Sequence, residues 1–285
     1  MNAIKKVQIL IIAFLFILPA AFAQVDYIQA KDYMAQMKKD KNMVTLHTGS
    51  AKDYKKKHIR GSILVSYKET EKAGDVKGLM QDASDLAALL GKAGVSNTNT
   101  IVVYDGGTQK YSTRVYWLLK YLGAADVKVL HKDLNTWRKS RVPLTAAPVK
   151  GKATTFAAKV NTNLLATTAD VKKAIDNSNA VIVDARAKTE FDGSDGKSKG
   201  HISSAVNLDY KELLTPSGAF KTKDQIKAIA DAAGITAGKE VILYCQTSIR
   251  GAVSYFAFKN VLGLDNVKLY DGAIEEWQTA NPLTK

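Results

Sequence analysis

Cys245 is the residue of this chain whose type and position most clearly suggest nucleophilic chemistry. It is the one cysteine among 285 residues, and it follows the apolar run Val241 to Tyr244, which predicts a buried strand. A short loop then leads, at Arg250, into a segment of helical period. Loop N–H groups at the start of a helix attract anions and favour the thiolate form of a cysteine. We therefore expect Cys245 to be a reactive thiolate; the alternative is an inert cysteine that closes a core strand.

The residues after Cys245 could bind an anion beside the sulfur. The predicted anion-binding loop consists of Gln246, Thr247, Ser248, Ile249 and Arg250. Its backbone amides and hydroxyl groups supply hydrogen-bond donors, and Arg250 supplies a positive charge. Arg186 and Arg114 are further candidates for substrate binding, with an ion pair to a nearby carboxylate as the alternative for each.

The cysteine count excludes two kinds of site. A single cysteine cannot form an intramolecular disulfide, and it cannot build a zinc cluster from cysteines. The four histidines, at positions 47, 58, 131 and 201, do not show the close spacing of metal ligands. The predicted chemistry needs neither a metal nor an organic cofactor.

The chain contains an internal duplication. Four landmarks recur 140 residues apart with no gap between them: Ile101 to Asp105 with Val241 to Cys245, Gly94-Val95 with Gly234-Ile235, Leu122-Gly123 with Leu262-Gly263, and Trp137 with Trp277. Further upstream, His58-Ile59 matches His201-Ile202 at an offset of 143, which predicts a loop of different length. Repetition of this kind indicates two homologous domains.

Each half repeats one order of strands and helices. Strands are predicted at 43–46, 63–66, 101–104 and 127–130, and again at 181–183, 205–208, 241–244 and 267–270. Helices are predicted at 84–93 and 113–122, and again at 224–233 and 252–262. Strands that alternate with helices form a parallel sheet with helices on both faces, so the predicted fold class is α/β.

The second half resembles the active-site half of a two-domain rhodanese, a thiosulfate sulfurtransferase. The resemblance rests on YCQTSIRGAVSYFAFKNVLG from Tyr244, on NVKLYDGAIEEW from Asn266, and on Asp184-Ala185-Arg186, and it covers essentially all of the chain after the first 23 residues. It implies two tandem rhodanese-like domains, with Cys245 as sulfur carrier in the second. The first domain would be an inactive copy, because Asp105 stands where the cysteine is expected.

The resemblance and the segment composition together give the domain boundaries. Residues 24–142 form the inactive copy, 143–155 a proline-containing linker across the surface, and 156–285 the catalytic domain. Residues 1–23 resemble a secretory signal peptide, with two lysines, a short apolar run and a small-residue site ending at Ala23. We expect cleavage there and an exported, periplasmic or secreted protein; a retained anchor is the alternative.

Two positions depart from some animal rhodaneses. Those proteins carry a lysine two residues after the cysteine. They also carry an arginine four residues after the arginine of the Asp-x-Arg segment, and both residues are credited with binding thiosulfate. Here the positions are Thr247 and Glu190. The resemblance implies a cysteine persulfide that passes sulfur from thiosulfate to cyanide or a thiol. A 3-mercaptopyruvate sulfurtransferase and a persulfide carrier without turnover are the alternatives.

Other function classes fit less well. Cysteine phosphatases of similar design place five residues between cysteine and arginine, whereas four lie between Cys245 and Arg250. The formal net charge of +14 suits anionic partners, but no basic motif interleaved with aromatics suggests nucleic-acid binding. The expected partners are a small anionic sulfur donor and a thiophilic acceptor, with no nucleic acid, no stable membrane insertion after cleavage, and a monomeric chain.

Overall fold

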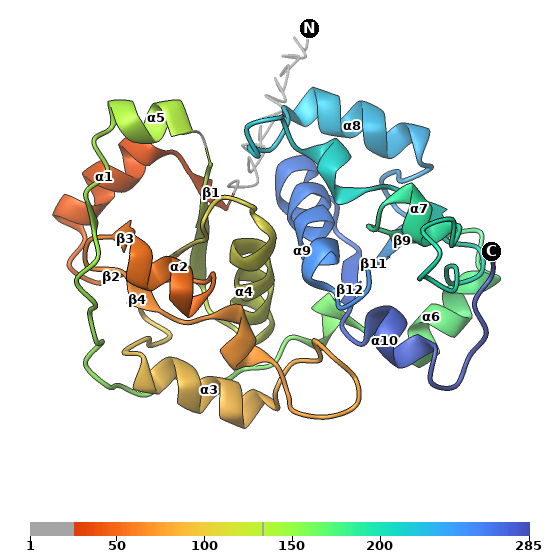
Figure 1. The fold of residues 1–285 in the computed structure, drawn as a ribbon, viewed down its shortest axis with the longest axis horizontal. Helices are drawn as coiled ribbons and strands as arrows, with labels where there is room; N and C mark the ends of the chain where they lie inside the picture. The colour runs from red at the N-terminus through yellow and green to blue at the C-terminus, as the bar shows by residue number, and fades with distance from the viewer. Residues whose placement is uncertain (1–25, 133) are drawn as a thin grey trace, which may run out of the picture.

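Two five-stranded parallel sheets organise the molecule (Figure 1). The computed structural model describes residues 26–132 and 134–285, so the predicted signal peptide lies outside the described residues. In spatial order the first sheet holds β1 (Tyr27–Ile28), β6 (Asp126–Leu130), β5 (Thr100–Tyr104), β2 (Met43–His47) and β4 (Ile63–Leu64). The second repeats that order with β8 (Leu165–Ala166), β12 (Val267–Tyr270), β11 (Glu240–Tyr244), β9 (Ala180–Asp184) and β10 (Val206–Asn207). The predicted fold class and duplication are confirmed.

Helices cover both faces of each sheet. The first domain contains α1 (Ala30–Lys39), α2 (Ala51–Lys56), α3 (Ala83–Lys92), α4 (Lys110–Tyr121) and α5 (Leu134–Lys139). The second contains α6 (Thr168–Ile175), α7 (Lys188–Phe191), α8 (Lys223–Ala232), α9 (Ile249–Phe256) and α10 (Ala273–Trp277). None of the helices in the described ranges is long and apolar enough to cross a membrane.

Side-chain alternation along β11 explains why two helical layers are needed. Val241 and Leu243 belong to the core beneath α8 and α9, while Ile242 and Tyr244 belong to the core with α6 and α10. Because successive residues of a strand point to opposite faces, a strand that is apolar throughout must be covered on both. The strand therefore ends, at Cys245, between two packed layers.

The predicted linker runs along the first domain. Its start includes β7 (Leu144–Thr145), which pairs antiparallel with β3 (His58–Ile59). Further on, the Thr154 N–H donates to the carbonyl of Gly91, and the Asn161 N–H donates to that of Tyr121. A 3₁₀ turn, Thr162–Leu164, then leads into β8.

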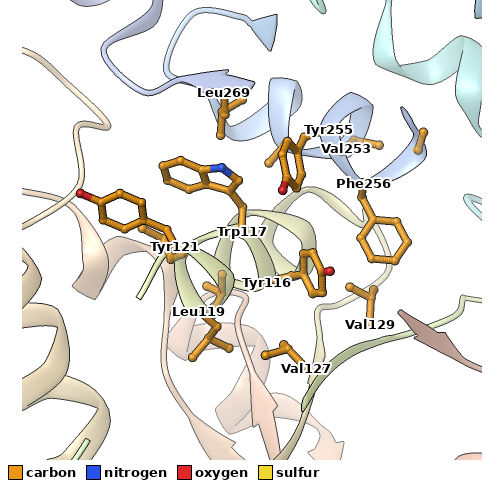
Figure 2. Close-up of a cluster of buried hydrophobic side chains, with 14 of the residues drawn as sticks. Tyr116, Trp117, Leu119, Tyr121, Val127, Val129, Val253, Tyr255, Phe256 and Leu269 are labelled. Atoms are coloured by element: carbon orange, nitrogen blue, oxygen red, sulfur yellow. The ribbon is translucent and has the colours of Figure 1, made fainter. Parts of the chain in front are cut away.

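Helices α4 and α9 join the two domains (Figures 1 and 2). The rings of Tyr116 and Phe256 meet edge to face with centroids 5.0 Å apart. The Tyr116 hydroxyl lies 3.1 Å from Oδ1 of Asn260, and the Trp117 indole N–H donates to the Leu164 carbonyl at 3.2 Å. One continuous apolar core thus includes residues of both domains.

The gap-free repeat predicted from sequence is wrong in one place. The residue that precedes each central helix is left-handed, Gln109 before α4 and Ser248 before α9, and these two are 139 residues apart. The loop after Cys245 is therefore one residue shorter than its copy. The offset of 140 returns at Gly123 and Gly263 because α9 continues into a π-helical turn, Ala257–Leu262, which takes in one extra residue.

Candidate active site

The register of the second sheet brings Cys245 beside the Asp184-Ala185-Arg186 segment. Tyr244 pairs with Asp184 at the ends of β11 and β9, so the two chains leave the sheet side by side. Cys245 is 1% exposed. Carboxyl ends of parallel strands are where ligands bind in open α/β sheets, and the predicted position of the thiol is confirmed by this topology.

The carbonyl groups of Cys245 and Gln246, at the start of the loop, accept hydrogen bonds from α10 and not from α9. The Cys245 carbonyl accepts the Ile274 N–H at 3.2 Å, and the Gln246 carbonyl accepts the Glu275 N–H at 3.3 Å. No group in the described part of the chain accepts a hydrogen bond from the N–H groups of 246–250. The loop therefore presents a set of free donors at the N-terminus of α9, which suits an anion.

The loop after Asp105 in the first domain shows how such a loop encloses an anion. One carboxylate oxygen of Asp105 accepts the N–H groups of Gly107, Thr108 and Gln109 at 2.7, 2.9 and 3.2 Å. Its other oxygen accepts the Tyr111 N–H at 3.0 Å and the Thr108 hydroxyl at 3.0 Å. An anion attached to the first residue of the loop is thus enclosed by loop amides. In the second copy the first residue of the loop is Cys245.

Arg250 is held by Glu190. The guanidinium donates to both carboxylate oxygens, at 2.5 and 2.8 Å. Burial lowers the pKa of Arg250, but the hydrogen bonds to Glu190 outweigh it, so the pKa lies above its ordinary value. The hydrogen bond from Arg250 holds the pKa of Glu190 below its usual 4.5. Both side chains are charged at neutral pH.

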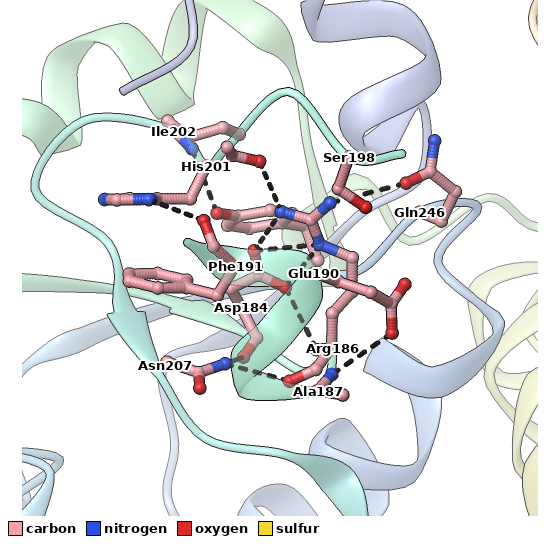
Figure 3. A network of polar contacts seen from close by, with 12 residues as sticks. Asp184, Arg186, Ala187, Glu190, Phe191, Ser198, His201, Ile202, Asn207 and Gln246 are labelled. Atoms are coloured by element: carbon pink, nitrogen blue, oxygen red, sulfur yellow. Dashed lines mark hydrogen bonds and ion pairs between the residues drawn. The ribbon is translucent and has the colours of Figure 1, made fainter. Parts of the chain in front are cut away.

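Arg186 lies in a buried polar network (Figure 3). Its guanidinium donates to both oxygens of Asp184 at 2.7 to 3.0 Å, to the Gly200 carbonyl at 2.7 Å, and to Oε1 of Gln246 at 3.4 Å. Burial lowers the pKa of Arg186, and the contacts with Asp184 more than reverse this. The alternative of an ion pair is what the structure shows, and a role of Arg186 in substrate binding stays a prediction.

The side chains of the predicted loop differ in their surroundings. Nε2 of Gln246 donates to Oε1 of Glu275 at 2.6 Å, and the Ser248 hydroxyl donates to the Tyr270 carbonyl. These side chains brace the loop. Gln246 and Ser248 would therefore contribute to an anion site through their backbone N–H groups. Ile249 begins α9. Thr247 lies against Gly78 of the first domain, where an added Cβ would come within 2.5 Å of the Thr247 Cβ.

Arg114 belongs to an interdomain contact that covers the loop after Cys245. Its guanidinium forms a buried ion pair with Asp271 and donates to the Gly78 carbonyl at 3.2 Å. Asp271 also accepts the Met80 N–H at 2.9 Å. The segment 72–80 of the first domain is thereby fixed beside Thr247. A substrate contact of Arg114 stays a prediction.

Sequence reasoning missed several residues that shape the site: Glu190 as the partner of Arg250, Glu275, Gly78, and Tyr210, whose N–H donates to the Ala185 carbonyl at 3.3 Å. Glu190 stood out only as a departure from the resembled family. The contact of Gly78 with Thr247 joins positions far apart in sequence, and no local pattern could have revealed it. Across residues 26–132 and 134–285, no group of three or more His, Cys, Asp or Glu side chains is placed to hold a metal.

The fold and site together define a class: a duplicated α/β protein with a single cysteine at the start of an amide-lined loop. The family described as "Rhodanese-like domain" matches residues 30–140 and again 167–280. The chain belongs to the rhodanese-like family, as the sequence resemblance indicated.

Several known proteins are similar to the chain over most of its length. A putative thiosulfate sulfurtransferase of Mycolicibacterium smegmatis is 29% identical, over 77% of this chain and 82% of its own. The thiosulfate sulfurtransferase of Bos taurus is 28% identical, over 79% of each chain. Among solved structures, SseA from Escherichia coli, described with the 3-mercaptopyruvate sulfotransferases, aligns with a TM-score of 0.79 at 26% identity, over 88% of this chain and 99% of its own. EanB with ergothioneine linked to a cysteine persulfide shares the fold, with a TM-score of 0.83 at 18% identity, over 91% of this chain and 70% of its own.

Proposed function

We propose that this protein is a sulfurtransferase that carries a sulfane sulfur on Cys245. The observation that carries the proposal is the loop itself: Cys245 opens a set of free N–H donors, and the equivalent loop of the first copy encloses the carboxylate of Asp105. Relatives named thiosulfate sulfurtransferase support the same activity.

The reaction takes place in two displacements. The Cys245 thiolate attacks the outer sulfur of thiosulfate, and a new S–S bond forms. The bond between the outer and the central sulfur of thiosulfate breaks, and the central sulfur leaves as sulfite. The loop amides stabilise the negative charge of the persulfide. An acceptor, cyanide or a thiol, then attacks the outer sulfur, and Cys245 leaves as thiolate. Sulfur is conserved at each step, and no outside oxidant is required.

A 3-mercaptopyruvate donor is the second candidate, and the pair Arg250–Glu190 is the observation that favours it. Thiosulfate carries two negative charges and mercaptopyruvate one. Glu190 offsets the charge of Arg250, so the site has less positive charge for a dianion. With mercaptopyruvate the C–S bond breaks, and the carbon fragment takes up a proton to become pyruvate.

Steady-state kinetics test the proposal. Two displacements that are linked by a covalently modified enzyme, here the persulfide, give parallel double-reciprocal lines when the concentrations of donor and acceptor are varied. Intersecting lines would contradict a persulfide intermediate. The release of sulfite over many cycles separates an enzyme from a persulfide carrier, which stops after one equivalent.

We also propose that the chain is exported and processed after Ala23. The support is the arrangement of two lysines, an apolar run and a small-residue site in the first 23 residues. Sequencing the N-terminus of the protein recovered outside the cytoplasm is expected to give Gln24 first. Recovery of the chain with Met1 intact would contradict processing.

A further inference from the structure

A basic groove lies between the two domains. It has a volume of about 610 Å³. The first domain lines it with the inactive loop, including Lys110, and with Lys132. The second domain lines it with residues from Tyr210, in the 3₁₀ turn Tyr210–Leu213, to Lys221. The volume is typical of a pocket for a small molecule.

Four lysines line this groove, and no described carboxylate does. Lys132 donates to the carbonyl of Gly107. Lys211 and Lys221 make no ion pair or hydrogen bond through their ammonium groups within the described residues. Like charges gathered on the walls of a hollow repel one another and attract anions.

Tyr210, which lines the groove, also adjoins the segment beside Cys245. The 3₁₀ turn that begins with Tyr210 packs on α9, whose first turn contains Arg250. Burial raises the pKa of Tyr210. The Tyr210 N–H donates to the carbonyl of Ala185 at 3.3 Å, and Ala185 follows the end of β9, which pairs with the end of β11 just before Cys245. Tyr210 therefore connects the groove with the segment beside Cys245.

We propose that the basic groove binds the sulfur acceptor, a small thiol that carries carboxylate groups. This inference rests on the proposed sulfurtransferase function. The donors are small anions that the loop amides can enclose, whereas the groove holds a larger molecule. Carboxylates on the lysines would direct the acceptor's thiolate toward the persulfide. The thiolate attacks the outer sulfur, the S–S bond to Cys245 breaks, and the product leaves as a persulfide of the acceptor.

The test measures the second half-reaction alone. Protein loaded with sulfur from thiosulfate is freed of excess donor and mixed with glutathione, which has two carboxylates, or with uncharged 2-mercaptoethanol. Intact mass spectrometry follows loss of the sulfur. The variant is Lys211→Glu with Lys221→Glu. Its matched control is Lys172→Glu with Lys173→Glu on α6, two exposed lysines outside the groove that give the same change of net charge.

The expected result is a rate constant for glutathione that is lower by ~10-fold in the groove variant, with the rate for 2-mercaptoethanol unchanged. Donor loading should be equal in both variants. Equal slowing of the two thiols, or equal slowing of glutathione in the control variant, would overturn the proposal.

A binding measurement keeps the groove testable if no sulfur is transferred. S-methylglutathione has the same charges and no free thiol, so its calorimetric titration does not depend on a persulfide. We expect binding to the unchanged chain and to the α6 control, and a loss of binding in the groove variant. Equal binding in all three proteins, or no binding in any of them, would overturn the proposal that the groove binds the acceptor. Failure of the persulfide to form, with this binding pattern intact, would overturn the sulfurtransferase proposal and with it the groove's role in accepting sulfur.

Discussion

Arg250 and Glu190 form a two-pronged ion pair at the N-terminus of α9, the helix that follows Cys245. Nη1 and Nη2 of Arg250 lie 2.5 and 2.8 Å from the two carboxylate oxygens, and the side chains are 22% and 24% exposed. The positive charge nearest the loop is thus shared with a carboxylate that comes from α7. This pairing fixes the direction of the guanidinium, and it reduces the positive potential at the N-terminus of α9.

Replacing Glu190 by glutamine should strengthen thiosulfate binding. The substitution removes a negative charge beside Arg250, which is worth about 1 kcal/mol in a partly exposed pair. We expect KM for thiosulfate to fall ~3- to 5-fold, with a smaller change in kcat. The control is Glu240→Gln, which breaks the Lys268–Glu240 pair at 2.7 Å with nearly the same exposure. A rise in KM, or an equal effect of the control, would show that Glu190 does not limit anion binding.

The stability contributed by Glu190 should decrease as the pH is lowered. Its folded-state pKa lies below 4.5 because Arg250 stabilises the carboxylate. A carboxyl group whose pKa is lowered by folding stabilises the folded state fully at a pH above its unfolded-state pKa. This stability is lost as the pH falls through its folded-state pKa. Urea unfolding of the unchanged chain and of Glu190→Gln should therefore differ at pH 7 and converge as the pH falls through the folded-state value, which lies below 4.5. A difference that widens on acidification has the opposite sign and contradicts this assignment.

Asp105 should be a stabilising anion in the first domain. It is 7% exposed, and its carboxylate satisfies several loop amides at once. Asp105→Ala leaves those donors without a partner, and we expect a loss of about 2–4 kcal/mol in unfolding free energy. Millimolar sulfate should recover part of the loss by occupying the vacated amides. Asp231→Asn, which breaks an exposed pair with Lys227, is the control. Sulfate that stabilises the control as much as the Asp105 variant would argue against an anion site in that loop.

Asp271 should hold the covering segment of the first domain in place. It is paired with buried Arg114 and accepts the Met80 N–H. Asp271→Asn leaves the arginine without a counter-charge, which costs about 3 kcal/mol. Hydrogen exchange at the Met80 amide should become faster. Asp82→Asn is the control, because Asp82 pairs with exposed Lys72 at the start of the same segment. Unchanged exchange at Met80 in the Asp271 variant would show that another contact fixes the segment.

Local patterns in the sequence predicted the central strands and the central helices of both domains. Val241 to Tyr244 was apolar throughout, which is typical of a strand covered on both faces, and β11 occupies that place. The edge strands β1 and β8 were missed because each has two residues, too few for a periodic pattern. The one-residue difference between the copies was also hidden, since the π-helical turn restores the offset before the next landmark.

The site could be predicted only in its backbone frame. The position of Cys245 follows from the end of a strand and the start of a helix, both of which are local features. The pairings of Arg250 with Glu190 and of Arg114 with Asp271 join residues 60 and 157 positions apart, so they depend on how the elements pack. An arginine near a cysteine indicates an anion site, but sequence alone does not show which carboxylate shares its charge.

The measurement that tests the central claim most directly is the mass of the intact protein after exposure to a sulfur donor. Purified chain is incubated with thiosulfate or with mercaptopyruvate, freed of small molecules, and weighed by mass spectrometry beside Cys245→Ser. We predict one added sulfur on the unchanged chain, located at Cys245 by peptide analysis, and none on the variant. A folded protein that gains no sulfur from either donor, or that gains it without Cys245, would contradict the account.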